Sequence, residues 1–223
     1  MENKNQSELR MKCVQAGLFG TNCRIVWNVE TREGFVVDPG DDAERILAEI
    51  RAEGLKITHI LLTHGHFDHI GAVKGVREGT GALVCISEKD AYRLETADGD
   101  TLRGFFGRRA KPENAVKPDV LLHEGDALEI AGRTWKVLET PGHTEGSVCF
   151  DDGSWLFTGD TLFAFSCGRT DLNGGNPTKM RESLARLGKI SGERLCFAGH
   201  EDDFRLSDAK MYNPMMDNGE WGA

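Results

Sequence analysis

Short apolar runs, bounded by polar or glycine-containing segments, recur along this chain. Such runs between turn residues are typical of buried strands. The predicted strands are residues 23–27, 34–37, 57–62, 83–86, 120–124, 127–130, 134–139, 147–150, 155–158 and 195–198. Asp151, Asp152 and Gly153 separate two of these runs and indicate a hairpin turn. The pattern therefore predicts a protein rich in β-structure.

Other stretches have apolar residues at helical spacing. In residues 41–54, Ile46, Leu47 and Ile50 share one face, an aspartate stands at the start as a cap, and Gly54 ends the stretch. The other predicted helices are residues 70–79, 87–94 and 177–189. Residues 101–119 carry basic side chains around two phenylalanines, and we expect a solvated loop or a flap near the site. Strands and helices alternate, which indicates an α/β fold.

Length and composition predict one globular domain. The chain has 223 residues, of which 39% are hydrophobic and 28% charged. We expect residues 1–10 to form a disordered tail and residues 11–223 a single domain. No apolar run approaches the ~20 residues of a membrane span, and the first ten residues lack the apolar centre of a signal peptide. The sequence therefore predicts no membrane partner.

Charge and cysteine usage narrow the class further. The net charge of −9 argues against a nucleic-acid-binding surface. None of the six cysteines forms a Cys-x-x-Cys pair, which argues against a thiolate zinc site or a redox dithiol. Free thiols in a reducing compartment are the simplest interpretation, so we expect a cytoplasmic protein.

Metal-binding side chains are concentrated in four short motifs that follow predicted strands. The first motif, Thr-His-Gly-His-Phe-Asp-His at residues 63–69, comes directly after an apolar run. The residues of the four motifs are His64, His66, Asp68, His69, His143, Asp160 and His200. Imidazole nitrogen and carboxylate oxygen suit zinc, iron or manganese. Seven ligands are more than one tetrahedral ion takes, and they suit two ions that share a bridging carboxylate.

These motifs, in this order, resemble the metallo-β-lactamase superfamily. Asp38 in Val-Val-Asp-Pro-Gly and Arg169 in Cys-Gly-Arg-Thr-Asp make the chain most similar to small hydroxyacylglutathione hydrolase-like (glyoxalase II-like) proteins. The resemblance extends over roughly residues 11–215. It implies an αββα sandwich, in which two mixed β-sheets pack face to face and helices flank them. The strand pattern alone leaves other α/β architectures open.

The resemblance also implies a ligand set and a reaction. By similarity to the family, His64, His66 and His143 would bind the first metal, Asp68, His69 and His200 the second, and Asp160 would bridge them. Two divalent ions are implied, zinc first, with iron or manganese as alternatives. A hydroxide shared by the ions would attack a thioester carbonyl, and Asp68 would be the catalytic side chain that supports it.

Substrate recognition is implied at one position. In glyoxalase II proteins a basic residue that matches Arg169 contacts the glutathione moiety, which predicts a small anionic thioester as substrate. That family's aromatic residue two positions later is Asp171 here, and a structural ion pair of Arg169 is the alternative. Asp38 is expected either to orient a ligand imidazole or to stabilise the turn before Pro39.

A different reaction is the alternative function. Persulfide dioxygenases look similar around residues 167–171 and bind one ferrous iron through residues that match His64, His143 and Asp160. Lactonases and β-lactamases of the superfamily use the same site as the thioester hydrolases. The Asn-Gly-Gly at residues 173–175 is typical of the hydrolase-like group and favours hydrolysis. The complete set of seven ligands argues against a non-catalytic binding module.

Overall fold

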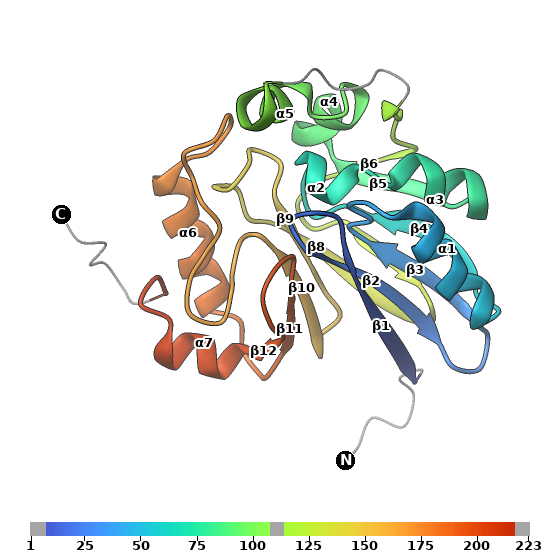
Figure 1. Ribbon diagram of the computed structural model, residues 1–223. Helices are drawn as coiled ribbons and strands as arrows, with labels where there is room; N and C mark the ends of the chain where they lie inside the picture. Colours follow the sequence, from blue (N-terminus) through green and yellow to red (C-terminus); the bar gives the residue numbers. More distant parts are fainter. Residues whose placement is uncertain (1–7, 108–113, 217–223) are drawn as a thin grey trace, which may run out of the picture.

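Two β-sheets pack face to face in the computed structural model, which describes residues 8–107 and 114–216 (Figure 1). The first sheet has the order β1-β2-β3-β4-β5-β6, with bounds Leu9–Ala16, Thr21–Asn28, Glu33–Val37, Lys56–Leu61, Leu83–Ser87 and Val120–Leu122. The second has the order β12-β11-β10-β9-β8-β7, with bounds Phe204–Arg205, Leu195–Ala198, Trp155–Gly159, Val148–Asp151, Arg133–Glu139 and Ala127–Ile130. Each sheet contains parallel and antiparallel pairs. The expected sandwich of two mixed sheets is confirmed.

Helices cover the outer faces of both sheets (Figure 1). On the first sheet lie α1 (Ala43–Ala52) and α3 (Val73–Thr80), and on the second lie α6 (Pro177–Gly188) and α7 (Leu206–Tyr212). The remaining helical elements lie between strands at one end of the sandwich: α2 (Phe67–Ile70), η1 (Glu88–Asp90), α4 (Ala91–Glu95) and α5 (Gly99–Phe106). In the part of the chain that the structure describes, no helix has the length and apolar character needed to cross a membrane.

The main core lies between the sheets. Phe35 of the first sheet packs edge-on against Trp135 and Phe157 of the second, with ring centroids 5.1 and 6.0 Å apart, and all three side chains are buried. β2 is buried along its whole length because it has the second sheet on one side and helices on the other. The strands are therefore a rigid base for the loops that follow them.

Three expectations about elements need correction. Residues 101–106 belong to α5 rather than to a loop, because Asp98 accepts a hydrogen bond from the Thr101 hydroxyl and the phenylalanines pack on other loops. No aspartate side chain caps α1; the Asp42 carboxylate accepts the N–H of Gly17 instead. β1 begins at Leu9, inside the expected tail, whereas residues 1–7 lie outside the described residues. The described residues also exclude the basic side chains of residues 108–113, namely Arg108, Arg109 and Lys111.

Candidate metal centre

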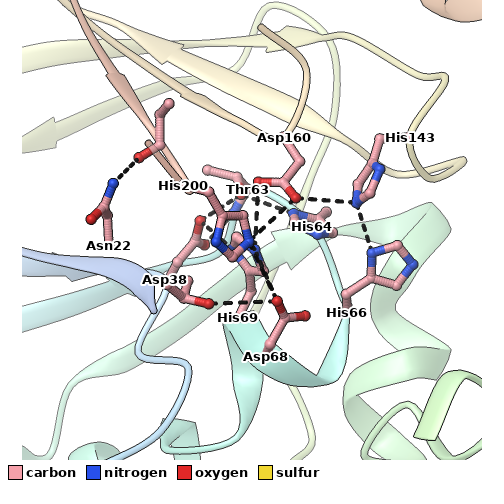
Figure 2. Close-up of polar contacts among 12 residues, drawn as sticks. Asn22, Asp38, Thr63, His64, His66, Asp68, His69, His143, Asp160 and His200 are labelled. Atoms are coloured by element: carbon pink, nitrogen blue, oxygen red, sulfur yellow. Dashed lines mark hydrogen bonds and ion pairs between the residues drawn. The ribbon is translucent and has the colours of Figure 1, made fainter. Parts of the chain in front are cut away.

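Four strand ends bring the motif residues together at one edge of the sandwich (Figure 2). β4 ends at Leu61, just before the motif at residues 63–69. β8, β10 and β11 end shortly before His143, Asp160 and His200. Because each loop starts from a strand that is hydrogen-bonded to a neighbouring strand on both sides, its first residues have fixed positions. All seven predicted residues therefore lie in one cluster.

Three buried histidines form the first group. The ligand atoms of His64, His66 and His143 all lie within 4.8 Å of one another. His66 Nδ1 and His143 Nε2 are 2.8 Å apart, and the buried Nε2 of His64 has no hydrogen-bond partner. His143 Nδ1–H donates to the carbonyl oxygen of Arg169 at 2.7 Å, so the Nε2 of His143 carries the lone pair. Buried nitrogen lone pairs that face one another fit a cation between them.

The protonation state of these imidazoles also favours the binding of a metal ion. Burial, reinforced by His143 and Arg93, lowers the pKa of His66 to about 2. Burial, together with the neighbouring histidines, also lowers the pKa of His64 well below its ordinary value. Both rings are therefore neutral at physiological pH, and neutral imidazole is the form that binds a metal.

Asp68, His69 and His200 form the second group. The Nε2 atoms of His69 and His200 are 3.3 Å apart, and Asp68 Oδ2 lies 3.4 Å from the latter and 3.9 Å from the former. Burial acts to raise the pKa of Asp68, but His69 and His200 outweigh it and bring that pKa below its usual range. The carboxylate is therefore ionised and faces two imidazoles.

Asp160 lies between the two groups (Figure 2). Its Oδ2 is 3.5 Å from His143 Nε2 and 3.6 Å from His200 Nε2, and its Oδ1 is 3.5 Å from His69 Nε2. Burial acts to lower the pKa of His69, but the carboxylates of Asp160, Asp68 and Asp38 raise it to about 10. Several carboxylates thus converge on one buried point, and this excess of negative charge fits a cation.

Asp38 supports the second group. Its Oδ2 accepts from His69 Nδ1–H at 3.0 Å and from the Thr63 hydroxyl at 2.6 Å, and its Oδ1 accepts from Thr63 N–H at 2.8 Å. Asp38, His64 and His69 are also close enough to hold an ion. Because both Asp38 oxygens already accept hydrogen bonds, the geometry fits an orienting role, which fixes the His69 ring with its Nε2 toward the cluster.

The loop that carries Arg169 is packed tightly against the centre. A Cβ on Gly168 would lie 2.0 Å from the carbonyl oxygen of Asp160, so a larger residue would displace this backbone. A cavity of about 340 Å³ is lined by Arg169 and by five of the seven ligand residues, namely His66, Asp68, His143, Asp160 and His200. The Arg169 guanidinium pairs with both carboxylate oxygens of Asp171, at 2.7 Å each, and stacks over Phe105 at 5.7 Å from the ring centroid. The side chain therefore faces the cavity with its charge already paired.

A network that no motif predicted connects the loops of the centre. Arg93 is almost fully buried, and its guanidinium lies 3.0 Å from Asp98 Oδ1 and 3.5 Å from Asp90 Oδ1. It also donates to the carbonyl oxygen of Asn173 at 2.6 Å. In the sequence, the ion pair of Asp90 and Arg93 is indicated only by the spacing of three residues. Exposed helices show the same spacing, so it does not predict a buried pair.

The two carboxylates of this network accept hydrogen bonds from both histidine loops. Asp90 accepts from Gly65 N–H at 2.8 Å, from the Thr144 hydroxyl at 2.7 Å and from Gly146 N–H at 3.1 Å. Asp98 accepts from Phe67 N–H at 3.0 Å. The network therefore fixes the positions of the loops of residues 63–69 and 143–146 relative to each other and to α5.

Comparison with known proteins agrees with this arrangement. A model of the metallo-beta-lactamase superfamily matches residues 16–200. Hydroxyacylglutathione hydrolase GloC of Haemophilus influenzae is 30% identical over 94% of this chain and 99% of its own length. The crystal structure of BLEG-1 B3 metallo-beta-lactamase, 34% identical, has a TM-score of 0.86 and covers 94% of this chain with 100% of its own. That of TTHA1623 in a di-iron-bound form, 35% identical, has a TM-score of 0.80, with coverages of 91% and 98%.

Proposed function

The chain belongs to the metallo-β-lactamase superfamily, and we propose that it is a two-metal hydrolase of thioesters of the hydroxyacylglutathione type. The observation that carries the proposal is the convergence of two groups of ligand side chains on Asp160. The similarity to GloC along nearly the whole of both chains supports a small-molecule thioester as the substrate class. All six cysteines are free in the structure, which supports a reducing, cytoplasmic location.

Seven side chains would hold the metals. We assign His64, His66 and His143 to the first ion, Asp68, His69 and His200 to the second, and Asp160 to both. Zinc is the proposed metal because it accepts nitrogen and oxygen ligands in such sites, and iron is the alternative, since a relative contains two iron ions. When bound, the two ions would supply Lewis-acid chemistry: they would polarise a carbonyl oxygen and lower the pKa of water toward neutrality.

The chain's own residues position the reactants. Among the described residues, the contacts of Asp68 with other side chains go to its Oδ2, which leaves Oδ1 to accept a hydrogen bond from the attacking water. Asp38 and the carbonyl oxygen of Arg169 fix the rings of His69 and His143. Burial raises the pKa of Cys167 to about 11, so this thiol is protonated and a poor nucleophile.

Arg169 would contact the thiol arm of the substrate. It lines the cavity of the metal centre and is exposed, so an anionic group can reach its guanidinium. The pair with Asp171 competes for the same donors, and an anion must share or replace it. A glutathione carboxylate would therefore be bound more weakly than by an unpaired arginine.

Metal analysis together with a panel of thioesters tests the proposal. We expect two ions per chain and hydrolysis of S-D-lactoylglutathione, with Asp68→Asn inactive and Cys167→Ser nearly as active as the native enzyme. One iron per chain with oxygen uptake on a glutathione persulfide would instead indicate a dioxygenase. If protein loaded with two ions hydrolyses no thioester but opens a lactone or a β-lactam, the thioester assignment is wrong.

A further inference from the structure

A second cavity adjoins the metal centre. It has a volume of about 290 Å³, close to the lower end of the range for small-molecule sites, roughly 300–1,000 Å³. Phe19, Phe67 and Asp68 line both this cavity and that of the metal centre. The remaining side chains around it are mainly apolar, among them Leu102 and Phe106. A group bound there would therefore be continuous with the reacting centre.

Four phenylalanines form the wall between the two cavities and the solvent. The centroids of every pair among Phe19, Phe67, Phe105 and Phe106 lie 5.4–6.3 Å apart. They come from three separate segments, namely the β1–β2 loop, α2 and α5. Phe19, Phe105 and Phe106 are 42–43% exposed. A contiguous exposed apolar patch at the mouth of a site is typical of a surface that a ligand covers.

The two sides of the metal centre differ in the charge of the side chains that line them. Among the described residues, no cationic side chain lines the apolar cavity, and its charged side chains are the carboxylates of Asp41 and Asp68. A third cavity contains Arg169 and Asp171, and it shares Arg169 and Phe105 with the metal centre. The apolar cavity and this third cavity, which contains a cationic side chain, have no lining residue in common, so the metal centre lies between them.

A thioester has two arms, acyl and thiol, on either side of the scissile bond. We propose that the apolar cavity binds the acyl arm, so that the enzyme prefers thioesters with aliphatic or small aromatic acyl groups over short hydroxyacyl groups such as lactoyl. This inference rests on the proposed thioester hydrolysis, in which Arg169 contacts the thiol arm. A lactoyl group has little apolar surface to bury against the four phenylalanines, which offer its hydroxyl no conventional acceptor. Among the described residues that line the cavity, the polar side chains are Asp41, Asp68 and Asn114.

Thioesters that share one thiol test the preference. S-Lactoyl-, S-hexanoyl- and S-phenylacetyl-N-acetylcysteamine differ only in the acyl arm, and their thiol is neutral. We expect kcat/KM for the phenylacetyl and hexanoyl substrates to exceed that for lactoyl by about tenfold or more, since filling an apolar site discriminates by factors of about 10–200. Equal values, or a higher value for lactoyl, would overturn the inference.

Phe106 is the residue to change, because it lines the apolar cavity but not that of the metal centre. Phe106→Ala should lower the phenylacetyl-to-lactoyl ratio of kcat/KM by about tenfold. Phe165→Ala is the matched control, since Phe165 is a phenylalanine with 65% exposure that lines none of these cavities. The control should keep the native ratio, and a ratio unchanged in Phe106→Ala would contradict the assignment.

A binding measurement separates this inference from the proposed function. The thioether S-(2-phenylethyl)-N-acetylcysteamine has the apolar arm but cannot be hydrolysed, and calorimetry reports its affinity. We expect Phe106→Ala to weaken its binding about tenfold relative to native protein and to Phe165→Ala. If no thioester is hydrolysed, the proposed function fails. If hydrolysis occurs while neither the ratio nor this affinity depends on Phe106, only the acyl assignment fails.

Discussion

Replacing Asp90 with asparagine tests whether the buried charge network fixes the two histidine loops. Asparagine has the shape of aspartate but only one acceptor oxygen. If that oxygen keeps the bonds from Gly65 and Thr144, the new amide faces the Gly146 N–H and the Arg93 guanidinium, so donors oppose donors. The substitution also removes one of the two carboxylates that balance Arg93.

The structure sets the expected size of the effect. Breaking a buried ion pair costs about 3–5 kcal/mol, and the remaining partner Asp98 places Asp90→Asn at the lower end, about 3 kcal/mol. For a domain of this length, 1 kcal/mol changes Tm by about 2–4 °C, so Tm should fall by about 6–12 °C. Gly65 lies between two ligand histidines, and a shift of about 1 Å in that loop would lower kcat/KM roughly 100-fold.

Differential scanning calorimetry and thioester kinetics measure the two effects, with kinetics recorded well below the lowered Tm. Glu88→Gln is the matched control because this carboxylate is close in sequence, exposed and paired only loosely with His123, at 3.3 Å. It should change stability by less than about 0.5 kcal/mol. An Asp90→Asn enzyme with a Tm within 2 °C of the native value and unchanged kinetics would refute the reasoning.

Two further predictions concern single side chains. Asp38→Asn should weaken binding of the second ion by about 10–100-fold, because the asparagine amide is a poor acceptor for both Thr63 and His69. Competition with a chelator measures the affinity for this ion, and an unchanged affinity would contradict the prediction. Cys167, with its pKa raised to about 11 by burial, is nearly all thiol at pH 8, so iodoacetamide should alkylate it roughly a few hundredfold more slowly than free cysteine, and the rate should rise with pH up to about 11. Rapid labelling at pH 8, seen by mass spectrometry, would exclude this pKa.

The sequence predicted the residues of the centre because each motif is local. His64 and His66 are two residues apart, and each of the other motifs follows a strand whose apolar pattern is clear. What the sequence could not predict is contact between segments. The sequence predicted either an orienting role or a turn role for Asp38, and no spacing rule indicates that its partner is His69, 31 residues away. Similarly, the sequence left open whether Arg169 contacts an anion or forms an ion pair, and in the structure its donors pair with Asp171.

α5 shows how tertiary packing overrides a local preference. Gly99 and Gly104 each lower helix stability by about 1 kcal/mol relative to alanine, so residues 101–106 read as a loop. The helix forms because Phe105 and Phe106 pack on Phe19, and because Asp98 accepts a hydrogen bond at its first turn. Only the solvated-loop alternative is therefore wrong, since α5 lies beside the site and supplies half of the phenylalanine wall.

The buried charges follow from the shape of the metal loops. A loop that curls to present several ligands cannot pair its N–H groups with a strand, and buried N–H groups need acceptors. The N–H groups of Gly65, Phe67 and Gly146 find theirs in Asp90 and Asp98. Two carboxylates buried side by side require a cation, which Arg93 provides. The motifs therefore imply that acceptors must exist near residues 63–69, but only the folded chain shows that a segment resembling a charged surface helix supplies them.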